Sequence, residues 1–370
     1  MKRSNTTDCK SVGISLRGFE SLPPHQKFMT NQLNQLIAAA ERIFITAHIS
    51  PDPDAISSAL LLYQTLRLNY PDKKIIAVLE EEPEGLSFLP GYKDLRFTRV
   101  LDATEEFAPD LFVLLDGNNF ERCSRKEGTA LRQYLKSVQA KVLIIDHHEL
   151  TGKDEAELFI NDQAPATVQN IFELCFGQLD LKQPKDAPQI ALTGFYADTG
   201  GFVYIKEGQE SRVFDFAREL VTAGAKVEIV KNELENYSET DMEVISELSA
   251  NLSHKDDYSF SYLSDEFIDG WLASGNSHQQ LQRPTNLFLN NFIRNIEGRS
   301  WGFTVYKNTL EGENIYSVSL RSQAGVPDVS KLASDLGGGG HKPAAGARFE
   351  SNSVKEAIQK VQSVIASSES

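Results

Sequence analysis

The sequence contains few cysteines, no long apolar run and fewer basic than acidic residues. Its three cysteines, Cys9, Cys123 and Cys175, lie far apart without a C-x-x-C pair, so neither a disulfide framework nor a cysteine-based zinc site is expected. No apolar stretch approaches the roughly 20 residues that cross a bilayer. The N-terminus also lacks the continuous apolar segment of a secretory signal. These absences predict a cytoplasmic protein with no membrane partner.

The charge balance limits the partners further. The 370 residues include 52 Asp and Glu against 37 Lys and Arg, a formal net charge of -15. Proteins that bind long DNA or RNA neutralise many phosphates with basic residues, so long duplex nucleic acid is not an expected partner. Small anionic substrates remain compatible with this charge if metal ions or a few local basic groups offset the acidic field.

The length predicts two domains, and the hydrophobic pattern separates them. Up to about residue 225, near-continuous apolar runs alternate with helical patterns, which indicates a doubly wound parallel sheet covered by helices on both faces. The apolar runs lie at 43–48, 75–79, 111–116 and 142–146. Helices are expected at 31–41, 56–68, 128–138, 166–176 and 188–197. We expect an N-terminal extension over residues 1–25 and a catalytic domain over 26–225.

The remaining chain predicts a smaller α+β domain. Helical patterns at 214–223, 227–234 and 242–251 place a helical linker at about 226–245 and the second domain at 246–370. Strands with an antiparallel appearance are expected at 258–263, 301–307 and 315–322. A glycine run, a short strand at 347–349 and an amphipathic helix at 354–365 follow.

Metal-type side chains follow three of the predicted strands and one predicted helix. They are His48, Asp52 and Asp54; Asp116; Asp146, His147 and His148; and Asp198 before a Gly-Gly turn. Ligands of open α/β sheets bind beyond the carboxyl ends of the strands, so these groups are expected to converge. Each alone has an ordinary explanation, since Asp52 or Asp54 could cap the next helix and Asp116 or Asp198 could sit in a turn. The joint pattern favours a metal site.

The composition of this set points to a class of reaction. Carboxylates with a few imidazoles suit Mn²⁺, Fe²⁺ or Mg²⁺ rather than thiolate-preferring ions. The ligands are too many for one tetrahedral site and match two neighbouring ions. Two-metal sites catalyse in-line displacement at phosphorus, so phosphoester hydrolysis is the first hypothesis.

Specific motifs agree with this hypothesis. The segments HISPDPDA (48–55), LLDGNN (114–119), IIDHHE (144–149) and GFYADTGGF (194–202) resemble the four motifs of the DHH phosphoesterase superfamily. SLRS (319–322) and LGGGGHKPAAG (336–346) resemble its DHH-associated domain of the Gly-Gly-Gly-His type. The resemblance covers roughly residues 30–365. In size, the chain looks most like the bacterial nanoRNase group of this superfamily.

The resemblance implies roles for the candidate residues. One divalent ion would be held by His48, Asp52 and Asp116. A second would be held by Asp54, Asp116, His147 and Asp198, so that Asp116 bridges the two. The implied ions are Mn²⁺, with Mg²⁺ or Fe²⁺ as alternatives, and the implied nucleophile is a metal-bridging hydroxide. Asp146 would orient a histidine, and His148 would face the substrate phosphate.

The resemblance also implies a substrate clamp, made of Arg321, Gly338, Gly339, Gly340 and His341. Taken alone, the glycine run could equally be a turn or a helix C-cap, and Arg321 a solvated charge on an edge strand. The implied active site lies in the cleft between the domains of a homodimeric enzyme. Its implied substrates are short single-stranded oligonucleotides, of about two to five nucleotides on the charge argument, cut to mononucleotides. A second implied substrate is 3′-phosphoadenosine 5′-phosphate, which would be converted to AMP.

Two alternatives stay open at this point. One is a phosphodiesterase for linear or cyclic dinucleotides. The other is a non-catalytic nucleotide-binding protein, which the complete ligand set disfavours. The sequence departs from the family pattern at Pro53, where glycine is more usual, and at Asn118 and Asn119, where small hydroxyl or acidic residues are more usual.

Overall fold

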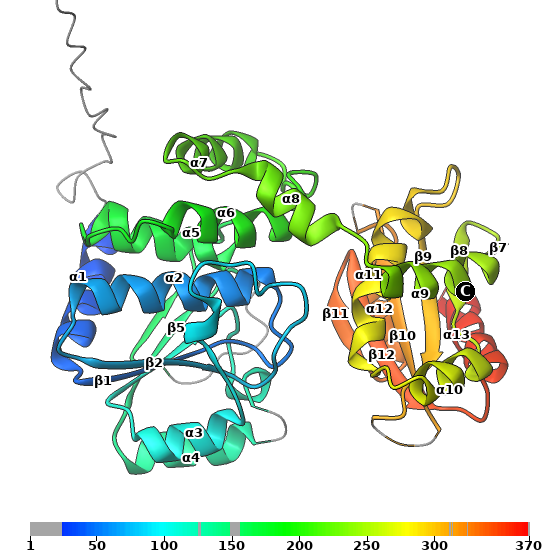
Figure 1. Cartoon of the computed structure of the whole chain (residues 1–370), viewed down its shortest axis with the longest axis horizontal. Coiled ribbons are helices and arrows are strands. Elements are labelled where there is room, and N and C mark those ends of the chain that lie inside the picture. Colours follow the sequence, from blue (N-terminus) through cyan, green and yellow to red (C-terminus); the bar gives the residue numbers. More distant parts are fainter. Residues whose placement is uncertain are drawn as a thin grey trace, which may run out of the picture. The chain divides into compact units, whose positions relative to one another are not determined.

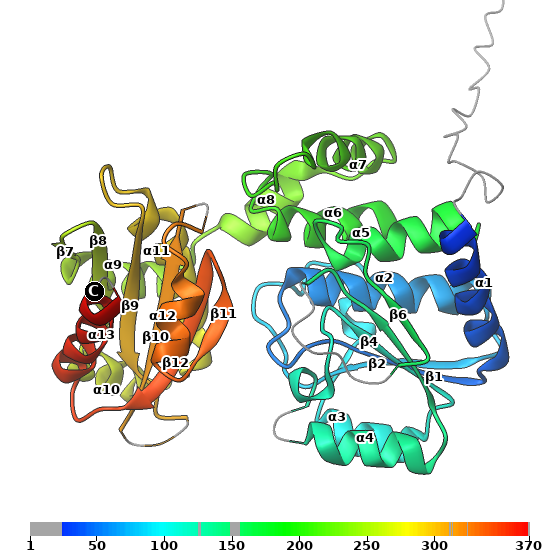
Figure 2. The same cartoon turned by 180° about the vertical axis from the view of Figure 1, so that it is seen from behind.

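The computed structural model describes residues 24–124, 127–148, 156–310, 312, 314–323 and 325–368. It divides into two compact units, Met1–Leu234 and Glu235–Ser370, each with its own sheet (Figures 1 and 2). The divide falls within the stretch expected to form a helical linker. Of the expected N-terminal extension, residues 1–23 lie outside the described part of the chain. None of the described helices is both long and apolar enough to span a bilayer.

The first unit contains a six-stranded sheet in the order β3-β2-β1-β4-β5-β6. Every neighbouring pair is parallel, which confirms the doubly wound α/β prediction. The strands are β1 (Arg42–Thr46), β2 (Lys74–Leu79), β3 (Arg96–Phe97), β4 (Leu111–Leu115), β5 (Lys141–Ile145) and β6 (Leu158–Ile160). The strand order reverses between β1 and β4, and this is the point at which such sheets bind ligands.

Helices cover both faces of this sheet, which explains the near-continuous apolar strands. In β1, Ile43 and Ile45 pack into one core, while Phe44 between them packs into the core on the other face. Figures 1 and 2 show α1, α2, α5 and α6 on one side and α3 and α4 on the other. Their bounds are α1 (Pro24–Ala39), α2 (Pro53–Asn69), α3 (Val100–Phe107), α4 (Gly128–Ser137), α5 (Thr167–Phe172) and α6 (Ala187–Asp198). A π-helical segment, η4 (Glu173–Gln178), continues α5, and α7 (Glu210–Thr222) and α8 (Val227–Glu235) complete the unit.

The first helix begins seven residues before the predicted start at residue 31. Its opening residues, PHQK, carry no apolar periodicity, so the sequence pattern did not indicate a helix there. Proline suits the first turn of a helix, because its fixed φ is helical and no hydrogen bond is lost there.

The second unit is built on a six-stranded sheet in the order β11-β12-β10-β9-β8-β7. Its strands are β7 (Ser253–Lys255), β8 (Tyr258–Tyr262), β9 (Trp301–Lys307), β10 (Ile315–Ser322), β11 (Gly339–His341) and β12 (Ala344–Glu350). Its helices are α9 (Glu239–Ala250), α10 (Asp265–Ala273), α11 (Gln282–Asn291), α12 (Val329–Asp335) and α13 (Val354–Ser368). The expectation of antiparallel strands was wrong for β8 and β9, which pair in parallel. The helices α10 and α11 lie between them in sequence and provide the crossover that parallel strands need.

Candidate metal centre

The predicted ligands of the first unit gather at the carboxyl edge of its sheet. His48 follows β1, Asp116 follows β4, and His147 follows β5, while Asp52 precedes α2 and Asp198 ends α6. The β1 and β4 groups therefore flank the point at which the strand order reverses. Segments up to 150 residues apart in sequence meet there because parallel strands all end at the same edge.

Asp52 both caps a helix and faces the candidate site. Its Oδ1 accepts hydrogen bonds of 3.0 Å from the backbone N–H groups of Asp54 and Ala55, so it is the N-cap of α2. Its Oδ2 lies 3.7 Å from His48 Nε2. The capping explanation raised from the sequence is thus correct for Asp52, and it leaves the second oxygen available to a metal ion.

Asp54 is fully buried and is held from the opposite side of the site. Its Oδ2 accepts a hydrogen bond of 2.7 Å from the Thr167 N–H, and its Oδ1 accepts one of 3.0 Å from the Val168 N–H. Burial, together with the nearby carboxylates of Asp116 and Asp198, raises the pKa of Asp54 well above its ordinary value. A site that crowds carboxylates in this way favours a bound cation.

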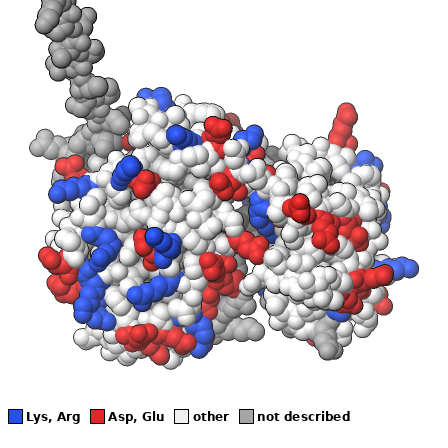
Figure 3. Space-filling view, viewed as in Figure 1, with Lys and Arg blue, Asp and Glu red and all other residues white. Residues whose placement is uncertain are grey.

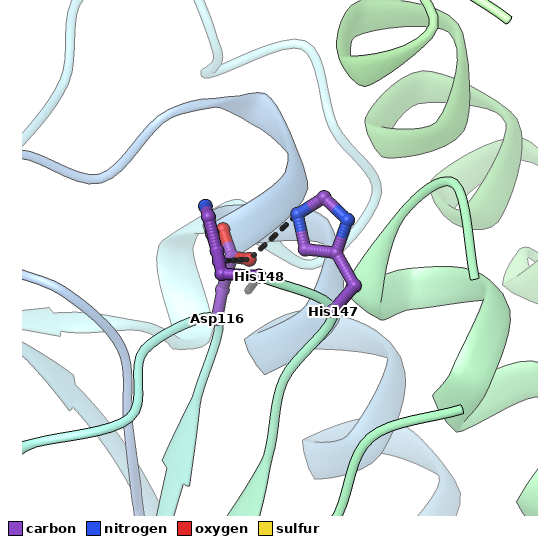
Figure 4. Close-up of side chains that lie close together, drawn as sticks. All are labelled: Asp116, His147 and His148. Carbon is purple, nitrogen blue, oxygen red and sulfur yellow. Dashed lines mark ion pairs between the residues drawn. The ribbon is translucent and has the colours of Figure 1, made fainter. Parts of the chain in front are cut away.

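Asp116 lies at the centre of the cluster, and only 1% of its surface is exposed. Its Oδ2 is 3.5 Å from His48 Nε2, and its Oδ1 is 3.5 Å from His147 Nε2 and 3.6 Å from His148 Nδ1. Figure 4 shows the carboxylate between the two adjacent histidines. Burial raises the pKa of Asp116, but the three histidines outweigh burial, so the pKa is lowered overall.

Asp146 fixes the orientation of His148. Its Oδ1 lies 2.7 Å from His148 Nδ1 and accepts hydrogen bonds of 2.8 and 3.2 Å from the backbone N–H groups of His147 and His148. The side-chain amide of Asn170 donates to the Asp146 carbonyl at 3.1 Å. A carboxylate that holds a histidine by Nδ1 sets its ring orientation and directs Nε2 outward.

His147 is oriented in a different way. Its Nδ1 lies 3.3 Å from the Ala164 carbonyl, and its Nε2 lies 3.0 Å from Asp198 Oδ2. This Nε2 is buried and makes no hydrogen bond of normal geometry with any described residue. Burial raises the pKa of Asp198 to about 6 against the opposing effect of His147. Burial lowers the pKa of His48 and of His147, but the surrounding carboxylates outweigh it and raise both to about 10.

Three overlapping groups of side chains could each hold a metal ion, with ligand atoms within 4.8 Å of one another. They are His48, Asp52 and Asp116; Asp54, His147 and Asp198; and Asp116, His147 and His148. The first matches one predicted ligand set, and the second contains three of the four members of the other. The acid-rich ligand set, with the buried Nε2 of His147 facing Asp116 and Asp198, fits divalent cations that prefer oxygen and nitrogen ligands.

Two residues of this site were not predicted from the sequence. Thr167 donates from its N–H to Asp54 and from its hydroxyl to Asp116 Oδ1 at 2.9 Å. Asn170, on the same helix, holds the Asp146 carbonyl. A threonine at the start of a predicted helix indicates a helix terminus, but no sequence pattern shows which distant carboxylate it contacts.

The predicted clamp residues lie in the second unit. Arg321 is on β10, between β9 and β12, and therefore is not the edge-strand charge that was the alternative. Its guanidinium donates to Asn286 Oδ1 and to the Leu320 carbonyl, both at 2.9 Å, and forms no ion pair with any described carboxylate. Burial, with the nearby charge of Arg294, lowers the pKa of Arg321 to about 10.

The glycine run is largely an edge strand instead of a flexible turn. Gly337, with φ 83°, directly follows Leu336, the C-cap of α12, which agrees with the C-cap alternative for this glycine. Gly339–His341, however, forms β11 against β12. A Cβ at Gly338 would lie 2.1 Å from the Gly346 carbonyl oxygen, and Gly340 has φ 146°. These positions therefore need glycine for close strand approach. The side chain of His341 lies outside the described part, so the composition of the clamp stays a prediction.

Two family models match this chain. Residues 42–197 match the model of the DHH family, N-terminal domain, and residues 288–367 match that of the DHHA1 domain. The first unit thus contains a DHH domain and the second a DHHA1 domain. Proteins named bifunctional oligoribonuclease and PAP phosphatase NrnA are similar over most of their length. The one from Bacillus subtilis is 25% identical over 87% of this chain and 94% of that protein, and the one from Thermus thermophilus 27% over 86% and 87%.

Other similar proteins are larger or are known by their structures. The cyclic-di-AMP phosphodiesterase PdeA of Listeria monocytogenes is 24% identical over 92% of this chain, which spans about half (49%) of that protein. The crystal structure of an exopolyphosphatase-related protein from Bacteroides fragilis shares the fold, with a TM-score of 0.77 and 23% identity over 92% of this chain and 96% of that one. This DHH chain is accordingly a phosphoesterase with an Asp/His cluster suited to divalent metal ions.

Proposed function

We propose that this DHH phosphoesterase hydrolyses short single-stranded oligonucleotides to mononucleotides and converts 3′-phosphoadenosine 5′-phosphate to AMP. The observation that carries the proposal is the set of overlapping ligand groups around Asp116 and His147. It occurs in a chain whose relatives from B. subtilis and T. thermophilus are named for both activities and match along nearly their full length.

We assign two divalent ions to this site, with Mn²⁺ as the first choice. His48, Asp52 and Asp116 would hold one, and Asp54, Asp116, His147 and Asp198 the other. When bound, such ions lower the pKa of coordinated water and neutralise charge on the scissile phosphate. The oxygen and nitrogen donors support this class of ion. A homodimer and a cytoplasmic location stay predictions.

The chain's own residues then position the phosphate. Hydrolysis breaks the P–O bond to the leaving sugar oxygen, adds the oxygen of water to phosphorus and returns a proton to that sugar oxygen. His148, held by Asp146 through Nδ1 at 2.7 Å, is proposed to donate from Nε2 to a phosphate oxygen. Because Asp146 also binds the backbone of this turn, the imidazole is oriented before substrate arrives.

The second unit is proposed to bind a non-scissile phosphate. Arg321 supports this role because its half-buried guanidinium has only neutral hydrogen-bond partners, Asn286 and Leu320, among the described residues. Guanidinium groups bind phosphate through two parallel hydrogen bonds. The backbone of Gly338, Gly339 and Gly340, together with His341, would complete this clamp.

Charge limits the proposed length of substrate. The net charge is -15, and acidic and basic side chains are interspersed on the visible face in Figure 3. A longer oligonucleotide would gain no row of basic contacts for its additional phosphates on that face. We therefore expect an optimum of about two to five nucleotides, because affinity for longer chains depends on such contacts.

A second candidate function is favoured by one relative. The similarity to the Listeria cyclic-di-AMP phosphodiesterase covers 92% of this chain, including both units. Linear or cyclic dinucleotides would present two phosphates, one for the metal centre and one for the clamp.

A substrate panel separates these functions. Purified full-length protein with Mn²⁺ is incubated with labelled oligonucleotides of 2 to 24 residues, 3′-phosphoadenosine 5′-phosphate and cyclic-di-AMP, with an Asp116→Asn preparation as the control for contaminating nucleases. The proposal expects kcat/KM to be highest for the short linear oligonucleotides, with mononucleotide products. Cleavage of cyclic-di-AMP at a higher kcat/KM than any linear substrate would favour the alternative.

A further inference from the structure

A cavity of about 530 Å³ lies beside the metal centre, within the first unit. Residues of α1, the end of β6, α5 and the π-helical segment η4 line it. Binding sites for small molecules occupy about 300–1,000 Å³, so a nucleoside would fit. We propose that this cavity binds the nucleoside on the leaving side of the scissile phosphate. The inference rests on the proposed function.

The cavity adjoins the proposed metal ligands. His147 and His148 line the cavity and also belong to the cluster of potential metal ligands. A phosphate held at that cluster would therefore lie next to the cavity, with the two imidazole rings at the boundary between them. The group esterified to this phosphate is therefore the part of the substrate that can reach it.

The charges of the lining favour a neutral group. Two acidic residues, Asp162 and Glu173, lie in the wall, and Arg212 pairs with both carboxylates at 2.9 Å. The exposed Lys206 adds one further cation. A second phosphate would meet two carboxylates whose single arginine is already engaged, whereas a nucleoside brings no charge of its own.

The lining also contains a hydrogen-bond acceptor and apolar surface that suit a nucleobase. Asn170 is 2% exposed, and its side-chain N–H donates to the Asp146 carbonyl, which fixes the amide orientation. Its Oδ1 has no hydrogen-bond partner among the described residues. A buried acceptor without a donor is costly, and an exocyclic amino group such as that of adenine would satisfy it. Met29, Ile160 and Leu174 supply apolar surface for the faces of a base.

The test measures binding without relying on hydrolysis. Adenosine, which carries no phosphate, is titrated into the full-length, Mn²⁺-loaded protein by calorimetry or by saturation-transfer NMR. Met29→Trp fills the cavity from α1, and Lys206→Trp fills it from another segment. The matched control is Phe28→Trp, because Phe28 is the preceding residue of α1, is 68% exposed and is not part of the lining.

Adenosine is expected to bind the parent protein and the Phe28→Trp protein equally. Both cavity variants should weaken binding by at least about tenfold, because the bulky side chain takes the space of the base. They should also raise KM for a dinucleotide while leaving hydrolysis of bis(p-nitrophenyl) phosphate, which has no nucleoside, unchanged.

Two results would overturn the inference. One is an absence of adenosine binding to a protein that hydrolyses dinucleotides. The other is unchanged binding in both cavity variants when their circular dichroism matches that of the parent. If adenosine binds and the cavity variants lose it, but no oligonucleotide is cleaved, the proposed function fails and the pocket assignment stands.

Discussion

The hydroxyl of Thr167 donates a hydrogen bond of 2.9 Å to Asp116 Oδ1, while the N–H of Thr167 donates one of 2.7 Å to Asp54 Oδ2. One residue at the start of α5 thus holds two carboxylates from different elements, Asp54 in the first turn of α2 and Asp116 at the end of β4. Both carboxylates are buried, and no described lysine or arginine forms an ion pair with them. Thr167 therefore sets the spacing of two proposed metal ligands without being a ligand itself.

Replacing this hydroxyl should weaken metal binding. Thr167→Val keeps the shape and the backbone bond to Asp54 but leaves Asp116 Oδ1 without its donor. A lost hydrogen bond to a charged acceptor costs on the order of 1.5–3 kcal/mol, so Mn²⁺ affinity should fall by about 10- to 150-fold. Electron paramagnetic resonance titration of free Mn²⁺ measures this directly. Thr167→Ser, which keeps the hydroxyl, should restore most of the affinity; equal losses in both variants would indicate a packing role only.

Removing the central carboxylate should be more severe. Asp116→Asn preserves size in a site that is 1% exposed but lacks the charge that both proposed ions share. Hydrolysis of every phosphoester should fall by a factor on the order of a thousand or more, because the shared ligand supports the whole site. Metal content measured by mass spectrometry should fall in parallel. An Asp116→Asn protein with normal activity would exclude Asp116 as a shared ligand.

The clamp can be separated from the chemistry by choice of substrate. Arg321→Ala should raise KM for a dinucleotide by about 10- to 150-fold, since a lost charge-assisted phosphate contact costs on the order of 1.5–3 kcal/mol. Hydrolysis of p-nitrophenyl phosphate, which has no second phosphate, should change little. Arg348→Ala is the matched control, because Arg348 is exposed on β12. Equal damage to both substrates would place Arg321 in folding or in the chemical step.

Metal binding should release protons and strengthen as pH rises. In the protein without metal, neighbouring carboxylates outweigh burial and raise the pKa of His48 and His147 to about 10, so both rings carry protons at neutral pH. A histidine ligand must first lose its proton, and raising the pH towards that pKa removes the competition. Calorimetry of Mn²⁺ binding in two buffers of different ionisation enthalpy counts the protons. An affinity independent of pH between 6 and 8 would contradict the assignment of these histidines as ligands.

The sheet of the first unit could be predicted because its strands are buried on both faces. Ile43, Phe44 and Ile45 serve two different cores, and that requirement is visible as an uninterrupted apolar run. The parallel pairing of β8 and β9 was missed, because strand direction depends on the helices that connect strands and not on the strands' own composition.

The candidate site, like the fold, could be predicted only in part. Residues such as Asp116 and His147 are chemically distinctive and stand at strand ends, so their sequence context indicates them. Thr167 is chemically ordinary, and its role arises from contacts with residues 51 and 113 positions away. The cavity likewise depends on how α1 and η4 pack, which no local pattern reports.

We propose that paired divalent ions at the Asp/His cluster give this chain its activity on short nucleotides. The most direct test removes metal by chelation, confirms the fold by circular dichroism, and follows conversion of a 5′-labelled dinucleotide to mononucleotide as Mn²⁺ is added back. We predict no turnover without metal and a rise that saturates at two ions per chain. Near-normal turnover by the folded, metal-free protein, or saturation at a single ion, would contradict a two-metal mechanism.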